Sequence, residues 1–271
     1  MTQNIVIIGI DCACQARDVG LARAEWSAGR ATVTDALCGS NGLPSIPSLV
    51  AEWMCGADHC VLALDAPLGW PQAMGMRLAS HTAGQAIPTE PNVIFRRETD
   101  RDIKLRFGKT PLDVGADRIA RTAHAALSLL DEVRQIADQN IPLAWDTGDL
   151  RGASAIEVYP AGTLLAHGLP ATGYKKPEHR QVRADILDAV GERLVLPENQ
   201  EAMLDDADCL DAVLCVLAAT DFLAGHAIAP SNAETARKEG WIWVRDAAAP
   251  APSTSRSGER RASRYAAVTR H

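Results

Sequence analysis

The sequence predicts an α/β fold in which a mixed β-sheet is flanked by helices. Three short apolar runs, 7–11, 61–65 and 155–157, each end on a carboxylate, which is typical of buried strands that deliver acids to one sheet edge. Between and after these runs lie segments with helical periodicity. The resulting order is strand, hairpin, helix, strand, helical insertion, strand and helices, which favours a sheet with mixed strand directions.

Buried strands are predicted where apolar, β-branched runs lack the alternation of a half-exposed strand. The strands expected in this way span 4–11, 59–65 and 153–159. Two further runs, 19–26 and 31–37, flank a short turn that contains Gly29, which predicts a β-hairpin. A short terminal strand is expected at 241–244, where Trp241 and Trp243 alternate as packing residues.

Helices are predicted by apolar periodicity and by capping residues. They are expected at 48–54, 119–136, 180–194 and 198–224. Ser45 and Ser48 are both candidate caps of the first helix. Residues 72–140 are rich in Arg, Asp and Ala, and we interpret them as a mostly helical insertion within one domain that spans 1–246.

Residues 247–271 are rich in Ala, Pro, Ser and Arg, with few large apolar side chains. Such a segment cannot bury enough surface to offset its conformational entropy, so we expect a disordered tail that is dispensable for folding. No apolar run approaches the ~18 residues of a membrane helix, and the first strand is too short for a signal peptide. Seven cysteines without a CxxC spacing agree with a cytoplasmic protein that does not enter a membrane.

The charge is unevenly distributed along the chain. The formal net charge is −7, but residues 248–271 carry five Arg and one Glu, so the preceding residues carry −11. Tight, sequence-independent binding to nucleic acid depends on neutralising phosphates with basic side chains. An acidic folded body therefore argues against a nuclease.

Asp11 and Asp65 are the first candidates for a functional site. If their strands are parallel neighbours, the two carboxylates lie roughly 5 Å apart at the carboxyl ends of the strands. Like charges this close raise each other's pKa unless a cation neutralises them. Mg²⁺ and Mn²⁺ prefer oxygen ligands, so a divalent-metal site is expected here.

The long helix adds two acids, Asp208 and Asp211, at i and i+3 on one helix face. Asp211 is followed by the apolar run 212–219, where an unpartnered carboxylate is costly. Taken singly, a strand-end Asp is often a turn former and Asp208 is a common first-turn acid. The coincidence of three acid-bearing segments favours a shared metal site of Asp11, Asp65, Asp208 and Asp211.

Several motifs resemble the domain-of-unknown-function family 429, described as predicted nucleases of RNase H fold. The resemblance spans about 200 residues and is carried by the motifs Gly9-Ile10-Asp11-Cys12-Ala13, Leu64-Asp65-Ala66-Pro67-Leu68-Gly69, Arg97-Glu98-Thr99-Asp100, Glu157-Val158-Tyr159-Pro160-Ala161, Tyr174-Lys175 and Asp208-Cys209-Leu210-Asp211-Ala212. The last motif is also similar to the final helix of bacterial Holliday-junction resolvases, where two acids at i and i+3 bind metal.

This resemblance implies an RNase H-like fold and assigns the acids to its active site. Asp11 corresponds to the first-strand acid, Asp65 to the fourth-strand acid, and Asp208 with Asp211 to the helix acids. Glu157 matches a family motif and is expected to join the catalytic group. The implied activity is phosphodiester hydrolysis with Mg²⁺ or Mn²⁺, acting on nucleic acid or another phosphodiester.

Two basic residues are candidates for substrate binding. Lys175 precedes a predicted helix and is expected beside the acids, while Arg97 lies in a cluster of basic residues between Arg96 and Lys109. Arg97 can instead form a structural pair with Asp100.

Two other functions stay open from the sequence. One is a non-catalytic binding or scaffold domain of the same fold, which the acidic body favours. The other is a phosphotransferase of the sugar-kinase and actin type, although those proteins need two such domains and glycine-rich phosphate loops. The sequence leaves the substrate and the oligomeric state open.

Overall fold

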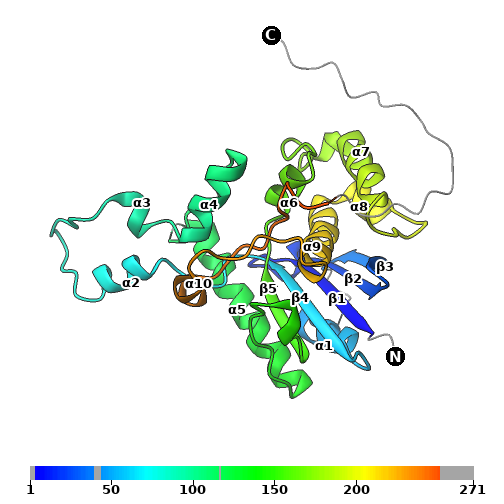
Figure 1. The fold of residues 1–271 in the computed structure, drawn as a ribbon, viewed down its shortest axis with the longest axis horizontal. Coiled ribbons are helices and arrows are strands. Elements are labelled where there is room, and N and C mark those ends of the chain that lie inside the picture. The colour runs from blue at the N-terminus through cyan, green and yellow to red at the C-terminus, as the bar shows by residue number, and fades with distance from the viewer. Residues whose placement is uncertain (1–3, 40–43, 116, 251–271) are drawn as a thin grey trace, which may run out of the picture.

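The computed structural model describes residues 4–39, 44–115 and 117–250, and shows a β-sheet between two helical layers (Figure 1). The five strands have the order β3-β2-β1-β4-β5. β1 is parallel to β4 and β4 to β5, whereas β2 is antiparallel to β1 and β3. The predicted mixed sheet is therefore confirmed. The strands span Ile5–Asp11 (β1), Gly20–Ser27 (β2), Arg30–Cys38 (β3), His59–Asp65 (β4) and Gly152–Glu157 (β5).

The central strands β1 and β4 are covered on both faces, as their unbroken apolar runs predict. Ile7 and Ile8 point to opposite faces, and both side chains are fully buried. The hairpin of β2 and β3 is also confirmed. Its turn residues Ala28 and Gly29 have φ values of 52° and 80°, the two positive values that a type I′ hairpin turn requires.

One face of the sheet is covered by α1 (Ile46–Met54) and α5 (Asp117–Ala137). Their apolar side chains join those of β1 and β4 in one core, with Val50 and Leu130 among its buried members. The Ser45 side chain accepts a hydrogen bond from the backbone of Ser48, which identifies Ser45 as the helix cap. The helix therefore begins two residues earlier than the predicted 48–54.

The other face is covered mainly by α9, with further helices packed around it (Figure 1). These helices are α6 (Pro160–Ala166), α7 (Arg180–Gly191), α8 (Glu201–Asp205) and α9 (Ala207–Leu223). The prediction of one helix over 198–224 is wrong, because the chain is extended at Asp206 (φ −123°, ψ 125°). The Asp206 side chain accepts a hydrogen bond from the Asp208 backbone and starts a new helix, which is the usual role of Asp as an N-cap.

Two glycines let the first turns of α9 approach the sheet closely. A Cβ added at Gly9 of β1 would lie 2.1 Å from the carbonyl oxygen of Ala212, and one at Gly20 of β2 would lie 1.9 Å from that of Asp208. Both distances are far below van der Waals contact. The missing side chains therefore bring the acid-bearing end of α9 against the strand that ends at Asp11.

Helices are present within the predicted insertion 72–140, but they do not form one separate unit. They are α2 (Gln72–Leu78), α3 (Pro91–Ile94), α4 (Glu98–Phe107) and α5. Figure 1 shows α2 and α3 extending away from the sheet, whereas α5 packs on α1 and completes a helical layer. The 3-10 turns are Ala16–Asp18, Thr147–Asp149 and Pro177–His179.

The C-terminal segment follows α10 (Ala233–Glu239) and passes the end of β5. The predicted strand 241–244 is wrong: within the described residues only an isolated bridge joins Ile242 to Glu157. The backbone of Ile242 instead donates a hydrogen bond to the Thr99 hydroxyl, so it does not continue a strand ladder. Trp241 and Trp243 are both buried in the core beneath α9, as expected of packing residues.

The tail expected at 247–271 lies mostly outside the described residues, which end at Pro250. Its first residues are held by Arg245, whose guanidinium donates to the carbonyl oxygens of Ala249 and Pro250. In the described ranges, every helix is too short or too polar to cross a lipid bilayer.

Candidate metal centre

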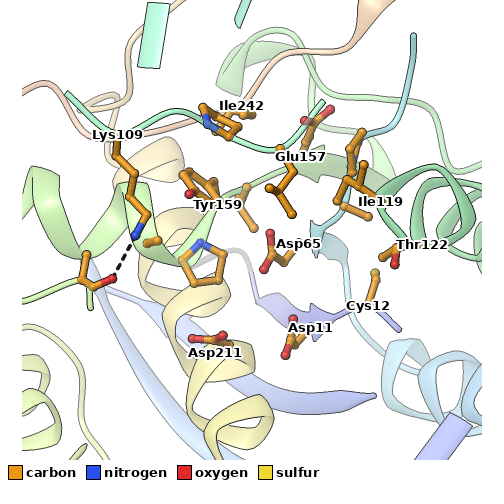
Figure 2. Close-up of a pocket in the computed structure, with 18 of the residues that line it drawn as sticks. Asp11, Cys12, Asp65, Lys109, Ile119, Thr122, Glu157, Tyr159, Asp211 and Ile242 are labelled. Carbon is orange, nitrogen blue, oxygen red and sulfur yellow. Dashed lines mark hydrogen bonds between the residues drawn. The ribbon is translucent and has the colours of Figure 1, made fainter. Parts of the chain in front are cut away.

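Three carboxylates from three elements meet at the carboxyl ends of the parallel strands. Asp11 ends β1, Asp65 ends β4, and Asp211 lies in the second turn of α9. One oxygen from each lies within 4.8 Å of the others, and Figure 2 shows the three side chains around one common space. The expected proximity of the two strand-end acids follows directly from their pairing in the sheet.

Burial makes this arrangement electrostatically unfavourable without a cation. Asp11 is 8 % exposed and Asp211 is fully buried. Burial raises the pKa of Asp11 well above its ordinary value, and the charges of Asp211 and Asp65 raise it further. Burial and the charge of Asp211 raise the pKa of Asp65 to about 7. These carboxylates therefore resist ionisation together.

Two neighbouring residues partly compensate Asp211. The buried Tyr174 hydroxyl donates a hydrogen bond of 2.8 Å to Oδ1, and the Lys175 ammonium forms an ion pair with Oδ2. Burial raises the pKa of Asp211, whereas Lys175 and Tyr174 lower it, and the net shift is upward. Lys175 thus lies beside the acids, as its position before a predicted helix suggested.

The donor set fits a hard divalent cation. Three carboxylates offer only oxygen ligands, which suits Mg²⁺ or Mn²⁺ rather than a softer metal. The Lys175 ammonium on Oδ2 of Asp211 does not by itself balance three carboxylates. A cation held between Asp11, Asp65 and Asp211 would neutralise their mutual repulsion.

Asp208, the fourth predicted ligand, lies outside this group. It is partly exposed in the first turn of α9, where negative side chains complement the helix dipole. Its charge contributes to the raised pKa of Asp11, so the two carboxylates are neighbours. Among the described residues, the acids that can share one ion are Asp11, Asp65 and Asp211.

Glu157 and Arg97 form a buried ion network beside the acids. The Arg97 guanidinium is 1 % exposed and forms ion pairs of 2.8 Å with both Asp100 and Glu157. The Glu157 carboxylate also accepts a hydrogen bond from the Leu68 backbone. The Arg97–Asp100 pair considered from the sequence is therefore present, and Arg97 also pairs with Glu157. The substrate-binding role of Arg97 and the catalytic role of Glu157 stay predictions.

The acids form the floor of a cavity of about 560 Å³. Its walls come from the loops after β1, β4 and β5, from the segment before and within α5, and from the segment before α7. Lys109 connects two of these walls, because its ammonium donates a 3.1 Å hydrogen bond to the carbonyl oxygen of Ala171 (Figure 2). The acidic group is thus reached through a defined pocket.

Some residues of this site have no direct signal in the sequence. The Tyr174 hydroxyl is the clearest case: its motif was recognised, but only its neighbour Lys175 was given a role. Leu112 and Ile119 line the cavity although nothing in the local sequence separates them from other apolar residues. Their placement depends on how α5 and the residues before it pack against the rest of the fold.

Comparison with known proteins agrees with the resemblance seen in the motifs. A family model described as "Protein of unknown function (DUF429)" matches residues 9–235, a span that includes Asp11, Asp65 and Asp211. No curated protein and no solved structure matches the chain. Because the matched span covers well over half of the sequence, the protein belongs to the DUF429 family.

Proposed function

We propose that this protein is a metal-dependent phosphodiesterase of RNase H-like fold that uses Mg²⁺ or Mn²⁺. The observation that carries the proposal is the convergence of Asp11, Asp65 and Asp211 at the floor of one cavity. The family resemblance implied acids on the first strand, the fourth strand and the last long helix. Asp11, Asp65 and Asp211 lie on β1, β4 and α9, which supports the same assignment.

The three carboxylates would hold the metal, which supplies Lewis acidity toward a phosphoryl oxygen and lowers the pKa of a bound water. The other residues have distinct tasks. Tyr174 fixes the orientation of Asp211 through its hydrogen bond, and Lys175 offers a positive charge at the same edge of the cavity. The apolar walls limit the access of bulk water, which strengthens the electrostatic interactions inside.

A non-catalytic domain is the second candidate, and one contact favours it. Lys175 forms an ion pair with Asp211, so part of the charge that a metal would neutralise is compensated by the protein itself. The acidic chain before residue 248 points in the same direction. In that case the acids and Lys175 form a structural polar cluster, and divalent metal has no effect on the protein.

Hydrolysis assays with matched variants test the proposal. The wild-type protein should hydrolyse bis(4-nitrophenyl) phosphate in Mn²⁺ and lose this activity when the metal is chelated. Asp65→Asn should lower the rate by orders of magnitude, because ligands of one site act as a unit. Asp35→Asn, the same substitution at an exposed position of β3, should leave it unchanged. Activity that persists in Asp65→Asn, or that no metal supports, would reject the proposal.

A further inference from the structure

We propose that the cavity binds a small, nucleotide-sized phosphate ester with an apolar ring, and that it does not accept a nucleic-acid duplex. This inference rests on the proposed function and narrows its substrate class. It depends on three observations: the enclosure of the acids, the chemistry of the cavity walls, and the number and position of the basic side chains.

The first observation is enclosure. The metal-binding group lies below the surface, with Asp211 fully buried and Asp11 8 % exposed. The cavity above it has a volume of about 560 Å³. Small-molecule sites typically measure about 300–1,000 Å³. To reach the three acids, a phosphate of a duplex would have to pass the loops that form the cavity walls.

The second observation is that much of the wall is apolar. Leu112 and Ile119 line one part of the cavity, and Pro67, Tyr159 and Ile242 line others. Figure 2 shows Ile119 and Tyr159 on different sides of the three acids. Apolar surface next to a metal site suits a ligand that joins a phosphate to an aromatic or other apolar group. Apolar walls contribute little to binding the charged sugar-phosphate backbone of a nucleic acid.

The third observation concerns the basic side chains of the lining, which are Arg97, Lys109, Arg118 and Lys175. Arg97 is enclosed by Asp100 and Glu157, and Lys109 donates to the carbonyl oxygen of Ala171. Arg118 and Lys175 are more exposed, and Lys175 is itself paired with Asp211. At most two cations are therefore left to complement a phosphate group beside a metal. Binding along a strand requires a positively charged groove that follows successive phosphates.

The net charge of −11 before residue 248 strengthens this distinction. A duplex carries many phosphates and would be repelled by the net negative charge of these residues, whereas a monomeric ester brings only one or two charges to the site. The site and the surface charge therefore favour a small substrate.

Two exposed leucines, both within residues 72–140, give a matched test. Leu112 is 71 % exposed and lines the cavity, whereas Leu105 is 84 % exposed and lies on α4 outside the cavity lining. Leu112→Asp and Leu105→Asp change the net charge equally, but only the first places a negative charge at the cavity. Binding of thymidine 5′-monophosphate in Mn²⁺ is measured by calorimetry, and binding of short single-stranded and duplex DNA by fluorescence anisotropy.

We expect the nucleotide to bind the wild type and Leu105→Asp alike, and Leu112→Asp about tenfold more weakly. DNA should bind more weakly than the nucleotide and equally in both variants. Tighter binding of DNA, equal nucleotide affinity in the two variants, or no nucleotide binding at all would overturn the inference. Melting curves establish that both variants are folded.

The hydrolysis assay separates this inference from the proposed function. Nucleotide binding as expected, without hydrolysis of any diester, would reject the phosphodiesterase and keep the small-ligand cavity. Metal-dependent cleavage of DNA that Leu112→Asp leaves unchanged would keep the phosphodiesterase and reject the small-ligand cavity.

Discussion

Asp11 and Asp65 occupy the same register position at the ends of two parallel, hydrogen-bonded strands. Neighbouring strands are about 4.8 Å apart, so this pairing alone brings the two carboxylates together. Asp211 then approaches from α9, which Gly9 allows to lie directly on β1. The backbone therefore enforces a charge repulsion that only a cation or a proton relieves.

Replacing Asp11 by Asn should have opposite effects with and without metal. Without metal the variant should be at least as stable as the wild type, because one of the repelling charges is removed. With millimolar Mn²⁺ the gain in melting temperature should shrink, because a ligand is lost and binding to the folded state stabilises by mass action. Melting curves of both proteins with Mn²⁺ and with a chelator measure this. An equal response to metal would contradict a ligand role for Asp11.

The stability of the metal-free protein should fall as pH rises. Burial and the charge of Asp211 raise the pKa of Asp65 to about 7 in the folded protein. In the unfolded chain it is near its ordinary value of 3.8. The folded state therefore binds this proton more tightly, and the free energy of unfolding decreases between about pH 4 and 7. Urea unfolding in the presence of a chelator at pH 5 and pH 8 measures the change.

Two further measurements test whether Asp65 causes this pH dependence of stability. Asp65→Asn should flatten this pH dependence, because the titrating group is gone. Mn²⁺ requires deprotonated ligands, so its stabilising effect on the wild type should grow over the same pH range. A stability that rises with pH in the absence of metal would contradict the assignment.

Gly9→Ala should destabilise the protein by about 1–3 kcal/mol, the usual cost of overpacking. The added methyl carbon would lie 2.1 Å from the Ala212 carbonyl oxygen, so α9 must shift away from β1. Asp211 moves with the helix, and the Mn²⁺-dependent gain in melting temperature should fall too. Gly75→Ala on α2 is the control, because a Cβ there meets nothing within 4 Å. Equal unfolding free energies for the two variants would exclude this tight approach.

Arg97→Met should be among the most damaging single substitutions outside the acidic group. It leaves Asp100 and Glu157 buried without their shared cation, and breaking a buried ion pair costs about 3–5 kcal/mol. Lys104→Met, at an exposed position of α4, which follows Arg97, should cost little. Urea titrations of both variants compare the costs. A mild effect of Arg97→Met on stability, together with a large loss of substrate affinity, would support the predicted substrate-binding role instead.

The sequence predicted those parts of the site that depend on local pattern. Apolar runs that end in Asp11 and Asp65 indicated buried parallel strands, and their pairing brings the acids together. The break at Asp206 was missed because the surrounding residues continue a helical pattern, while one capping hydrogen bond decides the backbone conformation there. Asp208 was grouped with Asp211 by helix spacing and by the motif resemblance. Which of them enters the acidic group depends on the depth at which α9 meets the sheet, a tertiary property that no local pattern encodes.

Lys175→Met distinguishes a metal centre from a structural polar cluster. The ammonium of Lys175 contacts the same Asp211 oxygen that a metal would use, so the two cations compete for it. Without Lys175 the metal-free protein should be less stable, because its positive charge lowers the pKa of both Asp211 and Asp65. The gain in melting temperature with Mn²⁺ should then exceed that of the wild type, since the metal replaces the missing charge and meets no competitor.

Lys176→Met, at the exposed neighbouring position, is the control and should respond to Mn²⁺ as the wild type does. If Asp211 and Lys175 form only a structural pair, Lys175→Met should lose stability that Mn²⁺ cannot restore. Melting curves of the three proteins across a series of Mn²⁺ concentrations separate these outcomes. A curve for Lys175→Met that is displaced downward and independent of metal would support the non-catalytic domain over the phosphodiesterase.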